Sequence, residues 1–345
     1  MRFRSTRWAG ILLAGAVACG GGNGDGDGDG DGDGDGDGDG DGSNPSCTTS
    51  GAFAADQAFA LPDEFTGQFF LAADQSACTA APDVVHTLVD LDGDGQLDLV
   101  VTGGCSVDPA VGRDHWLLFP GGADGFGASL TWDLPGEFTG QFFLAADQSA
   151  CTAAPDIVHT LVDLDGDDLL DLVVTGGCSV DPAIGRDYWR VFPGGTDGFG
   201  AGLDWALPAA FAGQFFLASD QAACSAAPDI VHTLVDLDGD DHLDLVVTGG
   251  CSVDPAIGRD HWRVFPGGTD SFGAAVDWTL PDAFTGQFFL AADQSACSAA
   301  PDIVHTLVDL DGDDQLDLVI TSGCAVDPAI GRDHWRVFSG ACQAP

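Results

Sequence analysis

The sequence predicts an all-β protein, a four-bladed β-propeller of 73-residue repeats whose ring is closed by an N-terminal strand. Three observations lead to this fold class. One segment recurs four times along the 345 residues, and each copy holds short β-branched and aromatic runs between Gly, Asp and Pro turns. The last copy ends before its final strand, and a similar segment precedes the first copy. Since an array must hide its end faces, a closed ring is favoured over the alternative, an open array of four units.

The first 18 residues are typical of a secretory signal. Arg2, Arg4 and Arg7 form a basic start, a short apolar stretch follows, and small residues lead to Cys19. This ending resembles a bacterial lipobox, so residues 1–18 are predicted to be a lipoprotein signal peptide and Cys19 to carry the lipid. We expect an exported protein, anchored by lipid to the bacterial outer membrane or cell surface without crossing it. Ordinary cleavage beside an unmodified cysteine is the alternative.

Residues 19–46 are predicted to be a disordered spacer. From Gly24 to Gly42 glycine alternates with aspartate, so no apolar side chain is available for burial and like charges repel one another. The favoured interpretation is a spacer that holds the folded part, residues 47–345, away from the membrane. Loose scavenging of calcium is the alternative.

The chain is strongly acidic. It carries 55 acidic and 10 basic side chains, for a formal net charge of −45. Such a surface repels nucleic acid and anionic lipid, so nucleic acid is excluded as a partner and only the lipid anchor is expected to touch the membrane. Clustered aspartates also repel one another in a fold, which predicts that cation binding and stability are linked.

The elements of a repeat can be taken in order. The repeats span residues 61–133, 134–206, 207–279 and 280–345, and each begins with Leu-Pro. In the first repeat a short apolar run at 68–71 precedes strands expected over 84–89, 97–102, 115–119 and 126–132. The fourth repeat lacks the last of these strands. Residues 51–60 are similar to it and are expected to complete the last blade.

The loop between the strands at 84–89 and 97–102 has the ligand spacing of a calcium site. With Asp90 as position 1, carboxylates stand at positions 1, 3, 5 and 9, and position 7 can offer its backbone carbonyl. Glycine at position 4 lets the chain fold back so that the carboxylates converge. About one Ca²⁺ per repeat is expected. The expected ligands are Asp90, Asp92, Asp94, Gln96 and Asp98; Asp163, Asp165, Asp167, Leu169 and Asp171; Asp236, Asp238, Asp240, His242 and Asp244; and Asp309, Asp311, Asp313, Gln315 and Asp317.

This loop differs from an EF-hand loop, which needs glycine at position 6 and a bidentate glutamate at position 12. Position 12 of the first copy is Val101, and position 6 is glycine only there. The flanking segments read as strands and not as helices, so the metal loop is expected to join two strands.

Ten of the eleven cysteines fall into pairs. An exported chain with one pair per repeat predicts disulfides, and zinc is disfavoured because no further Cys or His stands at ligand spacing. The two cysteines at the ends of the folded part would lock the ring. The expected disulfides are Cys78–Cys105, Cys151–Cys178, Cys224–Cys251, Cys297–Cys324 and Cys47–Cys342.

The segment from Val89 to Val101, with the later Phe119-Pro-Gly-Gly turn and residues 124–127, resembles the FG-GAP/VCBS family of repeats. The resemblance implies blades of a β-propeller with calcium in the loop between two blade strands. That family occurs in exported bacterial proteins and in adhesion receptors, and it implies a scaffold and not one activity. This chain departs from the family pattern in its longer cysteine-bearing segments and in the Asp at position 6 of three copies.

Three further residue sets recur once or more per repeat. The histidines are expected to be hydrogen-bonded between blades, with a second ligand site as the alternative. The arginines of Gly-Arg-Asp are expected to pair with carboxylates, with an anionic ligand as the alternative. The tryptophans are expected in the core, with carbohydrate stacking as the alternative. The sets are His86, His159, His232 and His305; Arg113, Arg186, Arg259 and Arg332; and Trp116, Trp132, Trp189, Trp205, Trp262, Trp278 and Trp335.

Nearly every reactive side chain is repeated in four copies, whereas a propeller enzyme needs unique residues at its site. We therefore expect no enzyme, but a monomeric calcium-binding module on the cell envelope, with an unidentified protein or carbohydrate ligand. A polysaccharide-acting lyase or glycosidase on the same scaffold is one alternative, because close carboxylates can act as acid and base. A purely structural surface protein is the other.

Overall fold

The computed structural model describes residues 60–72, 84–104, 107–123, 125–145, 157–177, 180–218, 230–250, 253–284, 287, 289–290, 303–310, 315–323, 326–330 and 332–340. The chain divides into two units, Met1–Ala58 and Phe59–Pro345, and every described residue belongs to the second. Within the described part, no helix is both long and apolar enough to cross a membrane.

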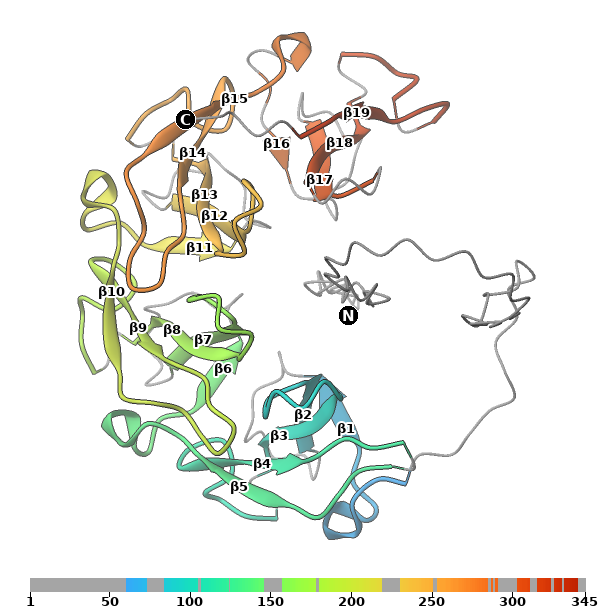
Figure 1. Cartoon of the computed structure of the whole chain (residues 1–345), viewed down its shortest axis with the longest axis vertical. Coiled ribbons are helices and arrows are strands. Elements are labelled where there is room, and N and C mark those ends of the chain that lie inside the picture. Colours follow the sequence, from blue (N-terminus) through green and yellow to red (C-terminus); the bar gives the residue numbers. More distant parts are fainter. Residues whose placement is uncertain are drawn as a thin grey trace, which may run out of the picture. The chain divides into compact units, whose positions relative to one another are not determined.

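Four β-sheets follow one another along the chain as the blades of a four-bladed β-propeller (Figure 1), which confirms the predicted fold class. Blade 1 contains β1 (Phe70–Ala72), β2 (Val84–Val89), β3 (Asp98–Gly103), β4 (His115–Phe119) and β5 (Leu130–Asp133). Blade 2 contains β6 (Phe143–Ala145), β7 (Ile157–Val162), β8 (Asp171–Gly176), β9 (Tyr188–Phe192) and β10 (Leu203–Ala206). Blade 3 contains β11 (Phe216–Ala218), β12 (Ile230–Val235), β13 (Asp244–Gly249), β14 (His261–Phe265) and β15 (Val276–Thr279). Blade 4 contains β16 (Phe289–Leu290), β17 (Ile303–Val308), β18 (Asp317–Ser322) and β19 (Arg336–Phe338).

Within each blade the strands pair in sequence order. The short first strand pairs in parallel with the second, and the remaining pairs are antiparallel. The predicted strands at 84–89 and 115–119 match β2 and β4, while β3 and β5 are displaced by one to a few residues from the predicted ranges. Short 3-10 turns, which the sequence analysis did not predict, follow each Leu-Pro: η1 (Asp63–Phe65), η2 (Gly136–Phe138), η3 (Ala209–Phe211) and η4 (Asp282–Phe284).

The third strand of each blade is the most buried element. All six residues of β3 are buried, and the same holds for β8 and β13. A strand covered on both faces reads as a continuous apolar run, which is why Leu-Val-Val follows the metal loops of blades 1 to 3 and Leu-Val-Ile follows that of blade 4. The third strand is therefore a rigid base for the loop that precedes it.

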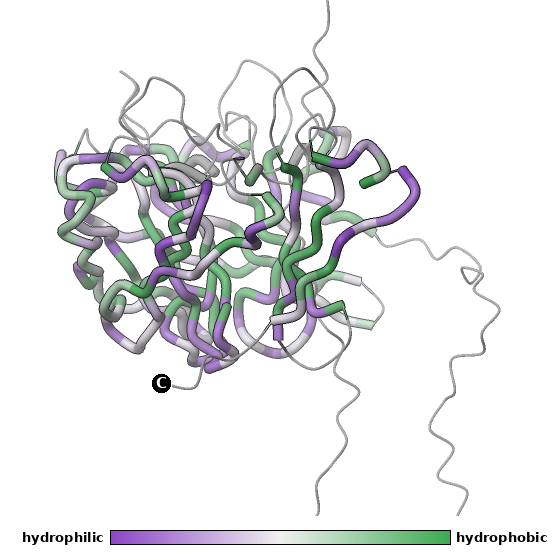
Figure 2. The backbone as a smooth tube through the Cα atoms, turned by 90° about the horizontal axis from the view of Figure 1, so that it is seen from above, coloured by the Kyte–Doolittle hydropathy of each residue, from purple (hydrophilic) through white to green (hydrophobic). Residues whose placement is uncertain are grey.

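Three of the hydrophobic clusters in the described part of the chain lie between successive blades. Trp116 of β4 is fully buried, and its ring lies 6.2 Å from Phe143 and 5.4 Å from His159 of blade 2. Trp189 and Trp262 repeat this contact at the next two boundaries. In Figure 2, apolar stretches run through the middle of the described tube, and many hydrophilic stretches lie toward its edges. The predicted core role is confirmed for Trp116, Trp132, Trp189, Trp205 and Trp262, whereas Trp335 is 59% exposed.

Two of the repeated arginines also contact the following blade. The guanidinium of Arg113 lies 4.2 Å from the ring centroid of Phe142, and that of Arg186 lies 4.3 Å from Phe215. At these two positions the described part of the chain shows a cation–π contact across a blade boundary, whereas the expected pairing with carboxylates stays a prediction.

Several sequence predictions lie outside the described residues. These are the signal peptide, Cys19 with its lipid, the spacer, residues 51–59 of the closing strand, all cysteines with their five disulfides, and the ligands Asp311 and Asp313 of blade 4.

Candidate metal sites

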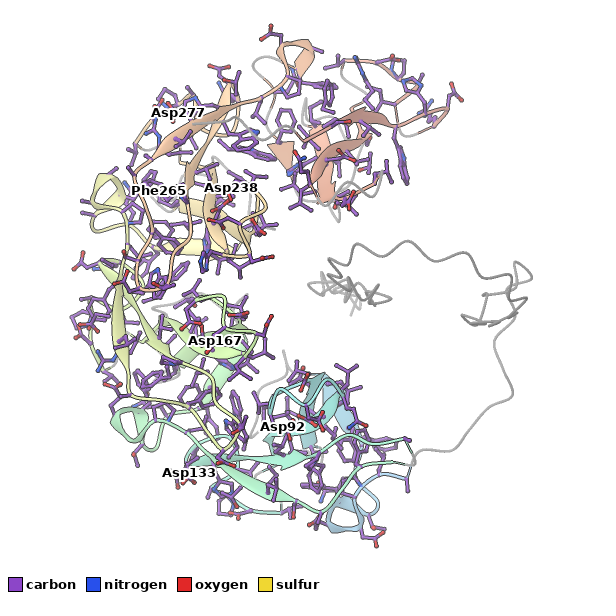
Figure 3. All side chains as sticks on the ribbon, viewed as in Figure 1. Asp92, Asp133, Asp167, Asp238, Phe265 and Asp277 are labelled. Carbon is purple, nitrogen blue, oxygen red and sulfur yellow. The ribbon has the colours of Figure 1, made fainter. Side chains whose placement is uncertain are left out.

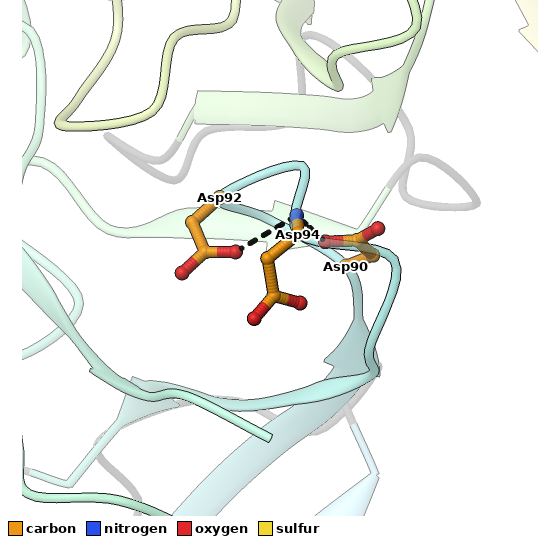
Figure 4. Close-up of side chains that lie close together, drawn as sticks. All are labelled: Asp90, Asp92 and Asp94. Carbon is orange, nitrogen blue, oxygen red and sulfur yellow. Dashed lines mark hydrogen bonds between the residues drawn. The ribbon is translucent and has the colours of Figure 1, made fainter. Parts of the chain in front are cut away.

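Three loops bring carboxylates close enough together to hold a cation. In blade 1, oxygen atoms of Asp90, Asp92 and Asp94 all lie within 4.8 Å of one another (Figure 4). Calcium–oxygen distances are roughly 2.3–2.6 Å, so two oxygens bound to one ion are at most about 5 Å apart. The loop therefore places three carboxylates within the reach of a single ion.

Backbone hydrogen bonds shape this loop around its first aspartate. The Asp90 carboxylate accepts the N–H of Asp94 at 3.1 Å and the N–H of Gly95 at 2.8 Å. Asp92 accepts the same Asp94 N–H at 3.2 Å. Such Asx-type turns fold the chain back on itself, and Gly93 supports the reversal with a φ of 75°. Local sequence alone thus turns the carboxylates toward one point.

Blades 2 and 3 repeat the loop with a different third carboxylate. Oxygens within 4.8 Å of one another come from positions 1, 3 and 9, which are Asp163, Asp165 and Asp171 in blade 2 and Asp236, Asp238 and Asp244 in blade 3. The position-5 residues Asp167 and Asp240 are exposed and lie outside these two clusters, although they accept the N–H of position 7 as Asp94 does in blade 1. Figure 3 shows Asp92, Asp167 and Asp238 at these loops, and Asp133 and Asp277 on the outermost strands of their sheets.

Position 6 adopts the left-handed conformation in every described copy. Gly95 has a φ of 83°, and Asp168 and Asp241 have φ values of 68° and 67°. Aspartate is one of the few residues other than glycine that visits this region readily. The replacement of glycine at position 6 therefore preserves the loop.

The aspartate at position 9 has a second role that the sequence analysis missed. Asp171 is fully buried; its carboxylate accepts the N–H of Leu164 at 2.9 Å and the N–H of Gly194 at 2.8 Å. It thereby ties the metal loop to the turn that follows the fourth strand. The same two bonds occur at Asp98, Asp244 and Asp317. The sequence carries one signal of this tie, the glycine that recurs in the turn. The turn lies so close to the loop that a Cβ on Gly194 would be 2.8 Å from the carbonyl oxygen of Leu170.

The clusters are electrostatically strained without a cation. Burial raises the pKa of Asp171 and of Asp244 to about 6, against the lowering effect of their two backbone hydrogen bonds. Burial, followed by neighbouring carboxylates, also raises the pKa values of Asp92, Asp165 and Asp238. A divalent cation would favour the ionised forms and relieve this repulsion.

The side chain at position 7 makes a contact that the sequence analysis did not predict. The sequence analysis assigned this position only a backbone carbonyl, but its side chain packs against the loop of the preceding blade. Leu169 lies against Gly93 so closely that a Cβ there would overlap it, and His242 lies in the corresponding place against Gly166. The glycine at position 4 is therefore needed both for its positive φ and for this contact.

The donor sets fit a hard divalent cation. Carboxylate oxygens dominate, and Oδ1 of Asp165 is buried without a hydrogen-bond partner among the described residues. In blade 4 the structure places Asp317 as in the other blades, while two of the expected ligands lie outside its described part.

Comparisons with known proteins add little about function. No family model matches the chain, and no curated protein matches it. A structure of the Photorhabdus luminescens Tc holotoxin pore is similar over 71% of this chain and 11% of that chain, with 17% identity and a TM-score of 0.37. This chain thus spans about a ninth of that protein's length.

Proposed function

We propose that this protein is a calcium-binding β-propeller of the FG-GAP/VCBS type, acting outside the cytoplasm as a binding module and not as an enzyme. The observation that carries the proposal is the recurrence of a three-carboxylate cluster at the same loop of three blades. Recurrence at equivalent positions favours a structural cation in each blade over a single reaction centre.

Calcium is preferred because of the ligand chemistry. The loops bring aspartate oxygens together, the backbone carbonyl of position 7 is the expected further ligand, and calcium accepts six to eight oxygens in flexible geometry. Each ion would neutralise carboxylates at the end of a buried strand. The blades would then present their connecting loops as a rigid surface for a protein or carbohydrate ligand.

The proposed location rests on the N-terminal sequence. The basic start, the short apolar stretch and the small residues before Cys19 favour export with a lipid anchor. Calcium is abundant outside cells at concentrations that suit modest-affinity sites, down to about 10⁻⁴–10⁻³ M for extracellular modules.

Calcium calorimetry on the full chain tests the proposal. We expect about four equivalent ions for the wild-type protein, and about one fewer for the double variant Asp163→Asn, Asp165→Asn. Asp204→Asn, on the outer strand β10, is the matched control and should retain every site. Equal stoichiometry in all three proteins would contradict metal binding at these loops.

A further inference from the structure

Blade 4, the last sheet of the series in Figure 1, ends on an open apolar face. The residues that it exposes are Leu310, Trp335 and Val337. Their equivalents in blade 1 belong to one buried core cluster at the contact with blade 2. Large exposed apolar groups gathered on one face mark an interaction site. The other blade boundaries show which kind of surface covers such a face.

At three blade boundaries the tryptophan of the fourth strand packs on a phenylalanine and a histidine of the next blade. Trp116 does so between blades 1 and 2, Trp189 between blades 2 and 3, and Trp262 between blades 3 and 4. The ring centroids are 6.0–6.2 Å apart for the phenylalanine and 5.1–5.4 Å apart for the histidine. The surface that fits Trp335 is therefore a Phe-His pair at the start of a blade.

Blade 1 carries such a pair on the face that does not contact blade 2. The rings of Phe70 and His86 lie 5.4 Å apart edge to face, as those of Phe143 and His159 lie 5.6 Å apart in blade 2. Phe143 is buried beneath the tryptophan of the preceding blade, whereas Phe70 is only half-buried. The receiving pair of blade 1 is thus assembled in the geometry that the other boundaries use.

A second contact is divided between the two end faces in the same way. Arg113 stacks on Phe142 of the following blade, and the same cation–π contact recurs between blades 2 and 3. The equivalent residues at the two ends of the blade series are Arg332 of blade 4 and Phe69 of blade 1. Both are exposed, and Phe69 is 76% exposed. Each end face therefore presents one half of two contacts that the inner boundaries complete.

We propose that the blade 4 face of one copy of this protein docks on the blade 1 face of a second copy, head to tail. Trp335 packs on Phe70 and His86 of the second copy, and Arg332 stacks on its Phe69. Among the described residues, no core cluster joins blade 4 to blade 1 of the same chain, so both faces of one chain are open together. The interface continues the blade boundary already present three times within each chain.

Such an interface joins two different surfaces, so it builds a ring of copies if its rotation closes and a longer row if it does not. The protein is then a self-associating module in place of the monomer that the sequence analysis expects. This proposal is independent of the proposed calcium binding, because the contacts that carry it involve none of the loop carboxylates.

Sedimentation equilibrium of the full chain in calcium tests the proposal. The wild-type protein should form a dimer or a larger species as its concentration rises. Trp335→Glu, and Phe69→Arg, which sets a like charge beside Arg332, should each weaken this association at least about tenfold. Leu203→Glu and Leu130→Arg, which make the same charge changes at exposed positions of the outer strands, are the matched controls and should associate as the wild type does.

Mixing the two interface variants distinguishes a second copy from closure of the ring within one chain. Trp335→Glu keeps an intact blade 1 face, and Phe69→Arg keeps an intact blade 4 face. Neither should associate alone, but an equal mixture should form a one-to-one heterodimer. Both side chains are exposed in the single chain, so the variants should fold, which circular dichroism checks.

Three results would overturn the proposal. A wild-type protein that stays monomeric at every concentration would show that blade 4 is covered within its own chain or remains open. Association that both interface variants retain would indicate another contact, such as calcium bridging between acidic surfaces. A mixture of the two variants that stays monomeric, although the wild type associates, would show that these two faces do not bind each other.

Discussion

Blades 1 to 3 and blade 4 are built from nearly the same sequence, yet their boundary residues have different environments. Leu91, Trp116 and Leu118 of blade 1 are at most 1% exposed, because they pack on blade 2. The equivalent residues Leu310, Trp335 and Val337 of blade 4 are 52%, 59% and 44% exposed. Burial in a repeat protein is therefore supplied by the neighbouring blade and not by the repeat's own sequence.

Blade 1 differs from the blade that follows it at its other face, the one that does not contact blade 2. Its face opposite blade 2 carries a cluster of blade 1 residues alone, including Phe65, Val84 and Phe119. In blade 2 the equivalent residues Phe138, Ile157 and Phe192 pack with side chains of the preceding blade. Blade 4 also has four described strands where the others have five. The predicted closing strand, residues 51–60, would supply the missing element.

Tryptophan truncation gives the largest expected effect. Trp189→Ala should lower the free energy of unfolding by about 3–5 kcal/mol, as is usual for a fully buried aromatic residue. If residues 51–60 close the ring, Trp335→Ala should cost a similar amount in the intact chain. Urea denaturation measures both variants. A loss below about 1 kcal/mol for Trp335→Ala would mean that this side chain remains exposed and that the ring is not closed.

The stability of the calcium-free protein should fall as pH rises. The folded-state pKa values of Asp171 and Asp244 are about 6, above the value of 3.8 for an unperturbed carboxyl group. The folded state therefore binds protons more tightly than the unfolded state does. At low pH this adds on the order of 2 kcal/mol per group to the free energy of unfolding, and the contribution is lost between about pH 4 and 6.

Thermal unfolding across this pH range measures whether the stability falls or rises with pH. Excess calcium should remove the decline, since a bound cation favours the ionised carboxylates. Asp171→Asn should flatten part of the calcium-free profile. Stability that rises from pH 4 to 6 in the presence of chelator would contradict the assignment of these groups.

Removing a position-9 aspartate should lower the free energy of unfolding more than removing a position-5 aspartate. Asp171→Ala removes the acceptor for two backbone N–H groups, those of Leu164 and Gly194, and should cost about 2–3 kcal/mol in chelator. Asp167→Ala, at an exposed position, should cost less than about 1 kcal/mol. Equal losses would show that the buried carboxylate does not anchor the loop.

The smallest effect is expected for Gly95→Asp, which gives blade 1 the position-6 residue of the other repeats. Gly95 has a φ of 83°, close to the 68° of Asp168, so the change should cost no more than about 1 kcal/mol. Gly95→Val is the matched control. A β-branched residue is strained at positive φ and should be clearly more destabilising in the same melts.

The fold was predictable because its signals are local and repeated. Strand positions, the Asp-rich loop and the core tryptophans follow from residue type and spacing, and four copies of each signal reinforce one another. The anchoring role of Asp171 was not predictable, because it depends on a turn more than twenty residues away. The contact of His242 with Gly166 was missed for a similar reason: it joins residues of two different repeats.

The central claim is that divalent cations stabilise the blades by neutralising converging carboxylates, and a thermal melt of the full chain tests it most directly. After chelation, calcium should raise the midpoint in a saturable manner with about four ions bound, while sodium chloride at equal ionic strength should not. An equal rise with either salt would show that the aspartate clusters respond only to screening, and the calcium assignment would then be wrong.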